Sequence, residues 1–493
     1  MGKGIAAKSN ARTAGNAVFA MISQMIITLT PLITTLFVSR ELGAENLGIF
    51  VHTLVMVQYF QMLANLGIVN YGARILAEDA DDTKKVSLHF WEIFGMQILT
   101  TAVFFAAYLI YILILPPSGK MMALVQILWL VGSFVDLNWF FYGIEEVKIT
   151  AIRDLFTKLL TIAGILLLVR KGHNPLIVYT LIMGGTNLIG LVIMLPLIKR
   201  YVYWVRPSLK GILAHLKPNL ILFIPLLATS VFHSMDKTML GYMTSYEELG
   251  YYYNADKIIN VPLSITNTLA TVFLPRATIL LQSPDTRHEA RDYLKKSFEL
   301  MILLSCAMAF GIAGCAKDFV PVFFGSGFES CTTLIYLFVP VLIIKSISTF
   351  FRMEYLVPTY REKLYITATF AGAAVNLIFN AFLIPRYGAA GAVAGTFLAE
   401  LTVMLVQMKG VDRNVPMKDM SVAMLSYLVM SVLMFGFMKV IGYIRASALI
   451  MVVIEIMGGA AFYVVLCLLY WKYVSRNNEI LELLTGMLRR KNA

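Results

Sequence analysis

The sequence predicts an all-α integral membrane protein of about 14 transmembrane helices. Of its 493 residues, 59% are hydrophobic and only 14% are charged, whereas a soluble globular domain has about 45–50% and about 25% respectively. Such a chain cannot cover a water-facing surface with polar groups. The mean hydropathy of +0.75 therefore indicates lipid as the main solvent and disfavours soluble enzymes, nucleic-acid-binding proteins and disordered scaffolds.

Fourteen segments have the roughly 20 apolar residues that cross a bilayer core. In chain order they lie near 15–39, 47–69, 88–115, 121–143, 153–169, 175–198, 219–241, 249–274, 297–316, 332–351, 363–384, 388–408, 420–441 and 446–471. The first is too long for the apolar region of a cleavable signal, so we expect it to stay in the membrane. The span at 249–274 is the most polar.

Basic residues alternate along the chain as the positive-inside rule requires. With the N-terminus inside, 30 of the 41 lysines and arginines fall in inner segments, 7 in outer segments and 4 within spans. This distribution predicts that both termini are cytoplasmic. Cytoplasmic loops then explain the net charge of +12, with no nucleic-acid partner. The tail after Trp471 should form a short basic helix on the membrane surface.

An internal repeat predicts two pseudo-symmetric six-helix lobes. A motif E-x-L-G, followed by a mid-helix asparagine and an inner arginine, occurs twice at an offset of 202 residues. Its members are Glu45, Leu47, Gly48, Asn65 and Arg74, and then Glu247, Leu249, Gly250, Asn267 and Arg276. Both copies begin inside, which predicts lobes related by an axis along the membrane normal, with a site between them. The expected domains are 1–205 (spans 1–6), 206–412 (spans 7–12) and 413–493 (two further spans and the basic tail).

Polar side chains within the spans mark the candidate site, because such groups are costly in hydrocarbon. On the span at 249–274, Lys257, Asn260 and Asn267 share one helical stripe with Ser264 and Thr271, at spacings of 3 and 4 residues. The other candidates for the cavity lining are Gln58, Asn65, Arg74, His233, Lys237, Arg276, Lys345 and Arg352. For the lysines we favour a water-filled cavity; hydrogen bonding between helices is the alternative.

Three acidic residues, Asp136, Asp236 and Asp256, are candidates for ion coupling. The last two each precede a lysine, and neighbours point about 100° apart on a helix. One member of each pair could therefore face the cavity while the other packs sideways. Cations at both ends of the cavity could hand an anionic head group from Arg352 toward Lys237. The sequence has no P-loop, metal-ligand cluster or nucleophile elbow, so we expect no cofactor, no metal and no enzymatic activity.

Five stretches carry more specific motifs. They are Phe37–Arg74 (FVSRELGAENLGIF, then NLGIVNYGAR), His89–Gln97 (HFWEIFGMQ), Trp139–Gly143 (WFFYG), Asp236–Gly241 (DKTMLG) and Pro385–Gly395 (PRYGAAGAVAG). They resemble bacterial oligosaccharide flippases of the polysaccharide-transport, or Wzx-type, family, within the multidrug/oligosaccharidyl-lipid/polysaccharide exporter superfamily. The resemblance covers most of the first 280 residues. It implies two six-helix lobes plus two helices, and a polyprenyl-diphosphate-linked oligosaccharide as substrate. It also implies that Lys237, within DKTMLG, meets the diphosphate.

The leading hypothesis is therefore a flippase that moves this lipid to the outer leaflet by alternating access, for exopolysaccharide, capsule or O-antigen synthesis. The bacterial cytoplasmic membrane is its expected location, with polysaccharide polymerase and assembly proteins as candidate partners. A peptidoglycan lipid-precursor flippase is one alternative. A cation-coupled multidrug exporter is another, although the first span contains no acid and Asp136 is the first lobe's only mid-span acid. The outer loops are too short for a glycosyltransferase or polymerase.

Overall fold

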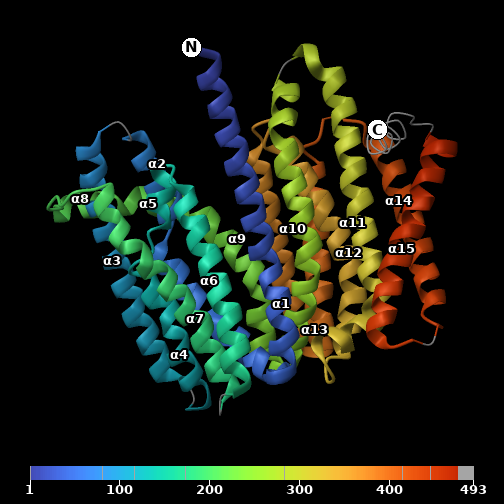
Figure 1. Ribbon diagram of the computed structural model, residues 1–493, viewed down its shortest axis with the longest axis horizontal. Coiled ribbons are helices and arrows are strands. Elements are labelled where there is room, and N and C mark those ends of the chain that lie inside the picture. The colour runs from blue at the N-terminus through green and yellow to red at the C-terminus, as the bar shows by residue number, and fades with distance from the viewer. Residues whose placement is uncertain are drawn as a thin grey trace. The chain divides into compact units, whose positions relative to one another are not determined.

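The computed structural model is built of α-helices (Figure 1). It describes residues 2–79, 82–115, 117–171, 174–282, 284–412, 415–444 and 446–475. Side chains are described from residue 30 onward, except at 117, 118, 171, 225, 228, 229, 231, 284, 474 and 475. Across these ranges helices alternate with turns and short connections, and there are no strands. The all-α prediction is confirmed. The predicted basic helix after Trp471 lies almost wholly outside the described residues.

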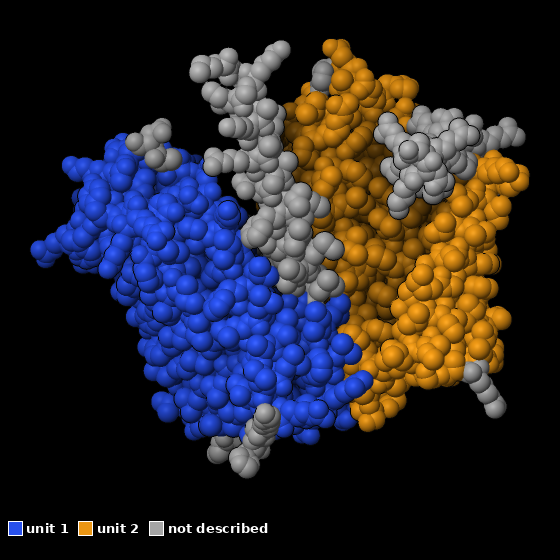
Figure 2. Space-filling model, viewed as in Figure 1, with its two compact units in different colours: residues 1–253 blue, residues 254–493 orange. Residues whose placement is uncertain are grey.

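The chain divides into two compact units, Met1–Tyr253 and Asn254–Ala493 (Figure 2). The first unit ends later than the lobe boundary at 205 that the repeat predicts. The reason is that α9 (Leu216–Met243) packs against α1 (Gly2–Asn65) and α2 (Ile68–Glu78). The repeat-based boundaries describe copies of a sequence unit rather than contacts, and they stay a prediction.

In the first unit, α1 is the central helix and packs against most of the others. The remaining helices are α3 (Thr83–Ile114), α4 (Pro117–Ser133), α5 (Asn138–Gly143), α6 (Val147–Leu168), α7 (Pro175–Met194) and α8 (Leu209–Ala214), followed by the start of α10 (Tyr246–Gln282). The first expected span and most of the second lie within α1, on either side of Gly43. That residue has a φ of +73°, which glycine adopts without steric cost and which lets the chain turn between the two spans.

A buried aromatic cluster explains two of the sequence motifs. The ring of Trp139 lies 5.6 Å from that of Phe90, and both side chains are fully buried. The indole N–H of Trp139 donates to Gln97 Oε1 at 2.8 Å, and the Gln97 amide donates to the carbonyls of Ser133 and Asp136. These residues therefore fix the break between α4 and α5. The motifs around Phe90 and Trp139 specify the interior of this unit rather than an exposed binding surface.

In the second unit, α11 (Arg287–Phe324) packs against three other helices. The unit comprises most of α10, then α11, α12 (Ser330–Phe350), α13 (Glu362–Met408), α14 (Met417–Ile441) and α15 (Ala448–Tyr470). The helix α13 holds two expected spans on either side of Gly388, where φ is +56°. After α12 the chain continues as a π-helical segment, Phe351–Leu356.

Ten helical segments within the described residues are long and apolar enough to cross a membrane. In this count, one segment runs from Thr30 to Glu78 and another from Glu362 to Met408. The first includes the end of one expected span and all of the next, and the second includes two expected spans. The multi-pass membrane character is therefore confirmed. The total of fourteen spans and the cytoplasmic location of both termini stay predictions.

Candidate substrate site

The two copies of the E-x-L-G motif pack against each other within the first unit. Gly48 lies so close to the backbone of Tyr246 that a Cβ would overlap it, and Gly250 lies equally close to the backbone of Ala44. Residues 44 and 246 are equivalent at the offset of 202, as are residues 48 and 250. The contact is therefore reciprocal, as expected for an interface with two-fold symmetry, and it gives the repeat a structural counterpart.

The Asp236–Lys237 pair on α9 is split in the manner that helix geometry predicts. The Asp236 carboxylate is buried and accepts a hydrogen bond from the Tyr252 hydroxyl at 2.7 Å. The Lys237 ammonium is partly accessible and lies 5.8 Å from the centre of the Tyr253 ring, a cation–π distance. Lys237 therefore has the better access to a substrate, whereas Asp236 packs between helices.

Other predicted residues of the first unit are spread over several surfaces. Gln58 and His233 are exposed, and Arg74 pairs with Glu78 at 2.9 Å on the surface of α2. Asn65 Oδ1 is buried and has no hydrogen-bond partner in the described part of the chain. Because leaving such an atom unsatisfied costs about 1–3 kcal/mol, Asn65 is a good candidate for binding a water molecule or a substrate hydroxyl.

The coupling candidate Asp136 has a structural environment. Its carboxylate accepts the backbone N–H of Asn138 at 3.0 Å, at the start of α5. The Asn138 side chain in turn accepts a hydrogen bond from Arg153 at 2.7 Å. Asp136 thus stabilises the break between α4 and α5, and its possible part in ion coupling stays a prediction.

In the second unit, the predicted polar stripe of α10 lies along one accessible face. Asn260, Asn267 and Thr271 are exposed, while Lys257 and Ser264 are partly accessible. The opposite face is buried through Ile258, Ile259, Leu263, Thr266 and Ala270. Asn267 Oδ1 also accepts a hydrogen bond from Thr349 of α12 at 3.3 Å. The structure therefore bears out the shared face of this stripe, while its ligand is untested. The coupling candidate Asp256, which precedes Lys257, is partly accessible.

Lys345 has a partner that the sequence reasoning did not assign. Its ammonium lies 3.3 Å from Glu400 of α13, and the two side chains are 25% and 6% exposed. The sequence gives no direct signal for this pairing, because the residues lie on different helices 55 positions apart. The pair lowers the cost of holding a lysine within an apolar helix. Lys345 is therefore a structural cation at least in part.

The two predicted arginines of the second unit differ in their surroundings. The Arg352 guanidinium lies 5.6 Å from the Tyr365 ring, and its Nε is buried without a hydrogen-bond partner among the described residues. Arg276 is exposed and lies 3.7 Å from Glu289. Of the two, Arg352 has the unused donor and is the stronger candidate for an anion contact.

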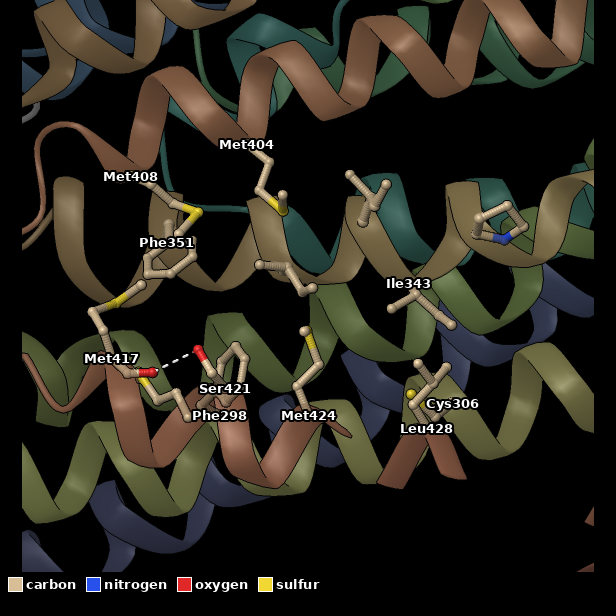
Figure 3. A pocket seen from close by; sticks show the side chains of 14 residues that line it. Phe298, Cys306, Ile343, Phe351, Met404, Met408, Met417, Ser421, Met424 and Leu428 are labelled. Carbon is tan, nitrogen blue, oxygen red and sulfur yellow. Dashed lines mark hydrogen bonds between the residues drawn. The ribbon is translucent and has the colours of Figure 1, made fainter. Parts of the chain in front are cut away.

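Two cavities in the second unit have a different chemistry. One, of about 330 Å³, lies between α11, α12, α13 and α14 and includes Met404, Met408, Met417 and Met424 in its lining (Figure 3). The other, of about 550 Å³, lies between α10, α11, α14 and α15. Their linings are almost entirely apolar, so they suit hydrocarbon chains and cannot hold a diphosphate. The polar faces are separate from them.

Sequence reasoning also missed a network of histidine hydrogen bonds in the first unit, next to α8. His89 Nδ1 lies 2.6 Å from Asp79, and His215 Nε2 lies 3.3 Å from Glu92. The Tyr71 hydroxyl lies 2.7 Å from His215 Nδ1. These residues are up to 144 positions apart and follow no local spacing rule. The network ties the start of α9 to α2 and α3.

The comparisons with known proteins agree with the fold. Residues 14–280 match the family described as "Polysaccharide biosynthesis protein". The chain belongs to this family. A relative in Escherichia coli (strain K12), named "Putative O-antigen transporter", is 22% identical over 408 residues, which are 81% of this chain and 96% of the relative. The resemblance to oligosaccharide flippases drawn from the motifs is confirmed.

One further relative and one solved structure are similar to this chain over most of its length. A protein of Haloferax volcanii named "Probable low-salt glycan biosynthesis flippase Agl15" is 22% identical over 456 residues, 88% of this chain and 91% of the relative. The solved structure titled "Lipid II flippase MurJ, inward closed conformation" matches with a TM-score of 0.72 at 12% identity, covering 92% of this chain and 99% of that one. At that identity the structural match supports the fold alone. Together, the family and these relatives identify the chain as a membrane transport protein of polysaccharide biosynthesis.

Proposed function

We propose that the protein is a flippase that moves a polyprenyl-diphosphate-linked oligosaccharide from the inner to the outer leaflet of a bacterial cytoplasmic membrane. The observation that carries the proposal is the accessible polar face of α10, with Lys257, Asn260 and Asn267, in a helix that is long and apolar enough to cross a membrane. Amides and hydroxyls bind sugar hydroxyls, and lysine binds phosphate. The family and the O-antigen relative support the same substrate class.

The physical problem for such a protein is the passage of charge and sugar through hydrocarbon. A hydrated polar face replaces the solvation that a diphosphate and its sugars lose on leaving water. The membrane potential, negative inside, favours outward movement of an anion by about 2.3 kcal/mol per charge per 100 mV. No nucleotide-binding motif is needed for transport in this direction.

Within this function we assign the reciprocal contact of Gly48 and Gly250 to the conformation that is closed at the outer side. Alternating access requires that the chain close and open at a defined place. Two glycines that each meet the backbone of the opposite copy permit a close approach that any side chain would prevent. The predicted orientation puts this contact at the outer side, where it would close the exit.

The alternatives differ in the chemistry that they require. A cation-coupled exporter needs a carboxylate free to bind its ion, and Asp136 already accepts the Asn138 N–H next to a structural arginine. A peptidoglycan-precursor flippase shares the diphosphate lipid and, as the lipid II flippase match shows, the fold. The glycan carried therefore separates it from our proposal, and the test must vary the glycan.

The test is flipping in proteoliposomes loaded with a polyprenyl-diphosphate oligosaccharide, scored by accessibility of the glycan to an external enzyme. We expect acceleration over protein-free vesicles, and loss of most of it in Lys237→Ala but not in Lys237→Arg. Lys418→Ala, which removes an exposed lysine from the start of α14, is the matched control. Equal flipping by Lys237→Ala and the control would overturn the role of Lys237.

Parallel vesicles carry the peptidoglycan precursor instead. Faster flipping of that lipid than of the oligosaccharide would favour the alternative flippase. Flipping of neither lipid, together with proton- or sodium-driven efflux of a cationic dye, would overturn the proposed function in favour of a drug exporter.

A further inference from the structure

The segment that follows α7 and ends with the first two residues of α9, residues 195–217 (called the linker below), carries an unusual combination of exposed groups. It contains five basic residues and no acidic one, and all five are exposed: Lys199, Arg200, Arg206, Lys210 and Lys217. Large apolar side chains of the same segment are exposed as well, with Trp204 at 69% and Leu209 at 68%. Cationic and large apolar side chains are therefore exposed together on one short segment.

Two arginines at other helix ends are paired with carboxylates. Arg291 lies 3.8 Å from Asp419, and Arg361 forms two hydrogen bonds to Asp412. By contrast, no described carboxylate lies within ion-pair distance of any of the five linker cations. Orientation of the protein during insertion requires basic residues, but it does not require that they stay unpaired beside exposed tryptophan and leucine.

The backbone of the linker is held while these side chains stay exposed. The indole N–H of Trp91 donates to the Tyr203 carbonyl at 3.0 Å, and the Tyr203 N–H donates to Ser87 Oγ at 3.3 Å. At its end, His215 contacts Tyr71 and Glu92. The segment is thus fixed on the first unit with its cations unpaired among the described residues, and it loses little conformational freedom on binding.

We propose that this linker binds anionic glycerophospholipids of the cytoplasmic leaflet, with its cations at the lipid phosphates and Trp204 and Leu209 among the acyl chains. Interfacial segments combine these two residue classes because apolar burial and phosphate attraction act at the same depth. The proposal goes beyond the transport function and does not depend on which lipid is flipped. Its consequence is that the start of α9 is anchored at the height of the lipid head groups.

The test uses full-length protein in nanodiscs that contain no polyprenyl lipid. The phospholipid is an equal mixture of phosphatidylcholine and phosphatidylglycerol, with bromine on the acyl chains of one or the other. The fluorescence signal of Trp204 is obtained by difference from Trp204→Phe. We expect stronger quenching by brominated phosphatidylglycerol, since each cation near an anionic surface contributes about a fivefold preference.

Two triple variants with the same change of charge provide the comparison. Replacing Lys199, Lys210 and Lys217 by glutamine should reduce the preference of Trp204 for phosphatidylglycerol at least fivefold. The control replaces Lys363, Lys409 and Lys418, which are also exposed, and should retain the preference. Equal quenching by the two lipids in the wild type, or equal loss in both variants, would overturn the proposal. Raising the salt concentration with wild-type protein tests the same attraction without any variant and should weaken the preference.

Discussion

Replacing Gly250 by alanine should shift the protein away from the conformation in which the two E-x-L-G motifs are in contact. The new Cβ would overlap the backbone carbonyl of Ala44, which cannot move aside as a flexible side chain could. Overpacking of this kind costs about 1–3 kcal/mol. The gain from alanine in a helix, up to about 1 kcal/mol, is present in both conformations and cancels. The closed conformation should therefore lose population by a factor of about 5 to 150.

The reciprocal geometry makes the prediction more specific. Gly48→Ala should have the same effect as Gly250→Ala, since it places a Cβ against the equivalent backbone at Tyr246. The double variant should shift the population by less than the sum of the two free energies, because helices separated by one Cβ have room for the second. Gly185→Ala is the control, as nothing lies within 4 Å of a Cβ at that position.

The assay is labelling of a reporter cysteine, Ala44→Cys, by a membrane-impermeant maleimide in intact vesicles. Ala44 is buried, and the four native cysteines are all buried, so background labelling should be slow. Labelling should accelerate in the Gly250→Ala and Gly48→Ala backgrounds and stay unchanged in the Gly185→Ala background. Unchanged labelling in both motif variants, at normal membrane levels, would refute the assignment of this contact to a closed state.

Three further outcomes follow from individual contacts. Lys345→Ala should destabilise the protein by about 3–5 kcal/mol, because it leaves Glu400 buried without its cation. Combining Lys345→Ala with Glu400→Gln should restore thermal stability. The rate of flipping by that double variant then shows whether the lysine also binds substrate. Burial lowers the pKa of His215 below its usual 6.5, so the unfolded state binds the extra proton. Unfolding midpoints should therefore fall as the pH decreases through about 6.5, and less so in His215→Gln. Trp139→Phe should cost about 1–3 kcal/mol in a denaturation experiment, because Gln97 Oε1 loses its buried donor.

The sequence predicted those features that depend on local spacing. Apolar runs gave helices at most of the expected places, although the span expected near 121–143 is broken between α4 and α5. The 3-and-4 spacing of Lys257, Asn260 and Asn267 put them on one accessible face. The E-x-L-G motif identified positions that prove to be close-packed. Each of these depends on helical periodicity or on a repeat, which a single chain displays directly.

Contacts between distant helices could not be predicted in this way. The pairing of Lys345 with Glu400, and that of His215 with Glu92, depends on how helices pack in three dimensions. Asp136 shows the converse, a residue predicted to be functional that makes a structural contact. An acidic residue in an apolar span indicates a functional site, yet at the break before α5 this one accepts a backbone hydrogen bond, which hydropathy alone does not reveal.

The polar residues of α10 indicate whether that face of the helix contacts water or lipid. A lysine at the bilayer centre costs about 2.5–3.5 kcal/mol on translocon-based scales, and each unsatisfied amide adds further cost. Lys257 and Asn260 facing lipid would thus cost a substantial part of the roughly 5–15 kcal/mol by which proteins are typically stable. Because these side chains are accessible and share a face, we expect that face to contact water rather than lipid. A water-exposed stripe along a membrane-spanning helix is the feature that a carrier of a sugar diphosphate needs and that a purely structural helix would not retain.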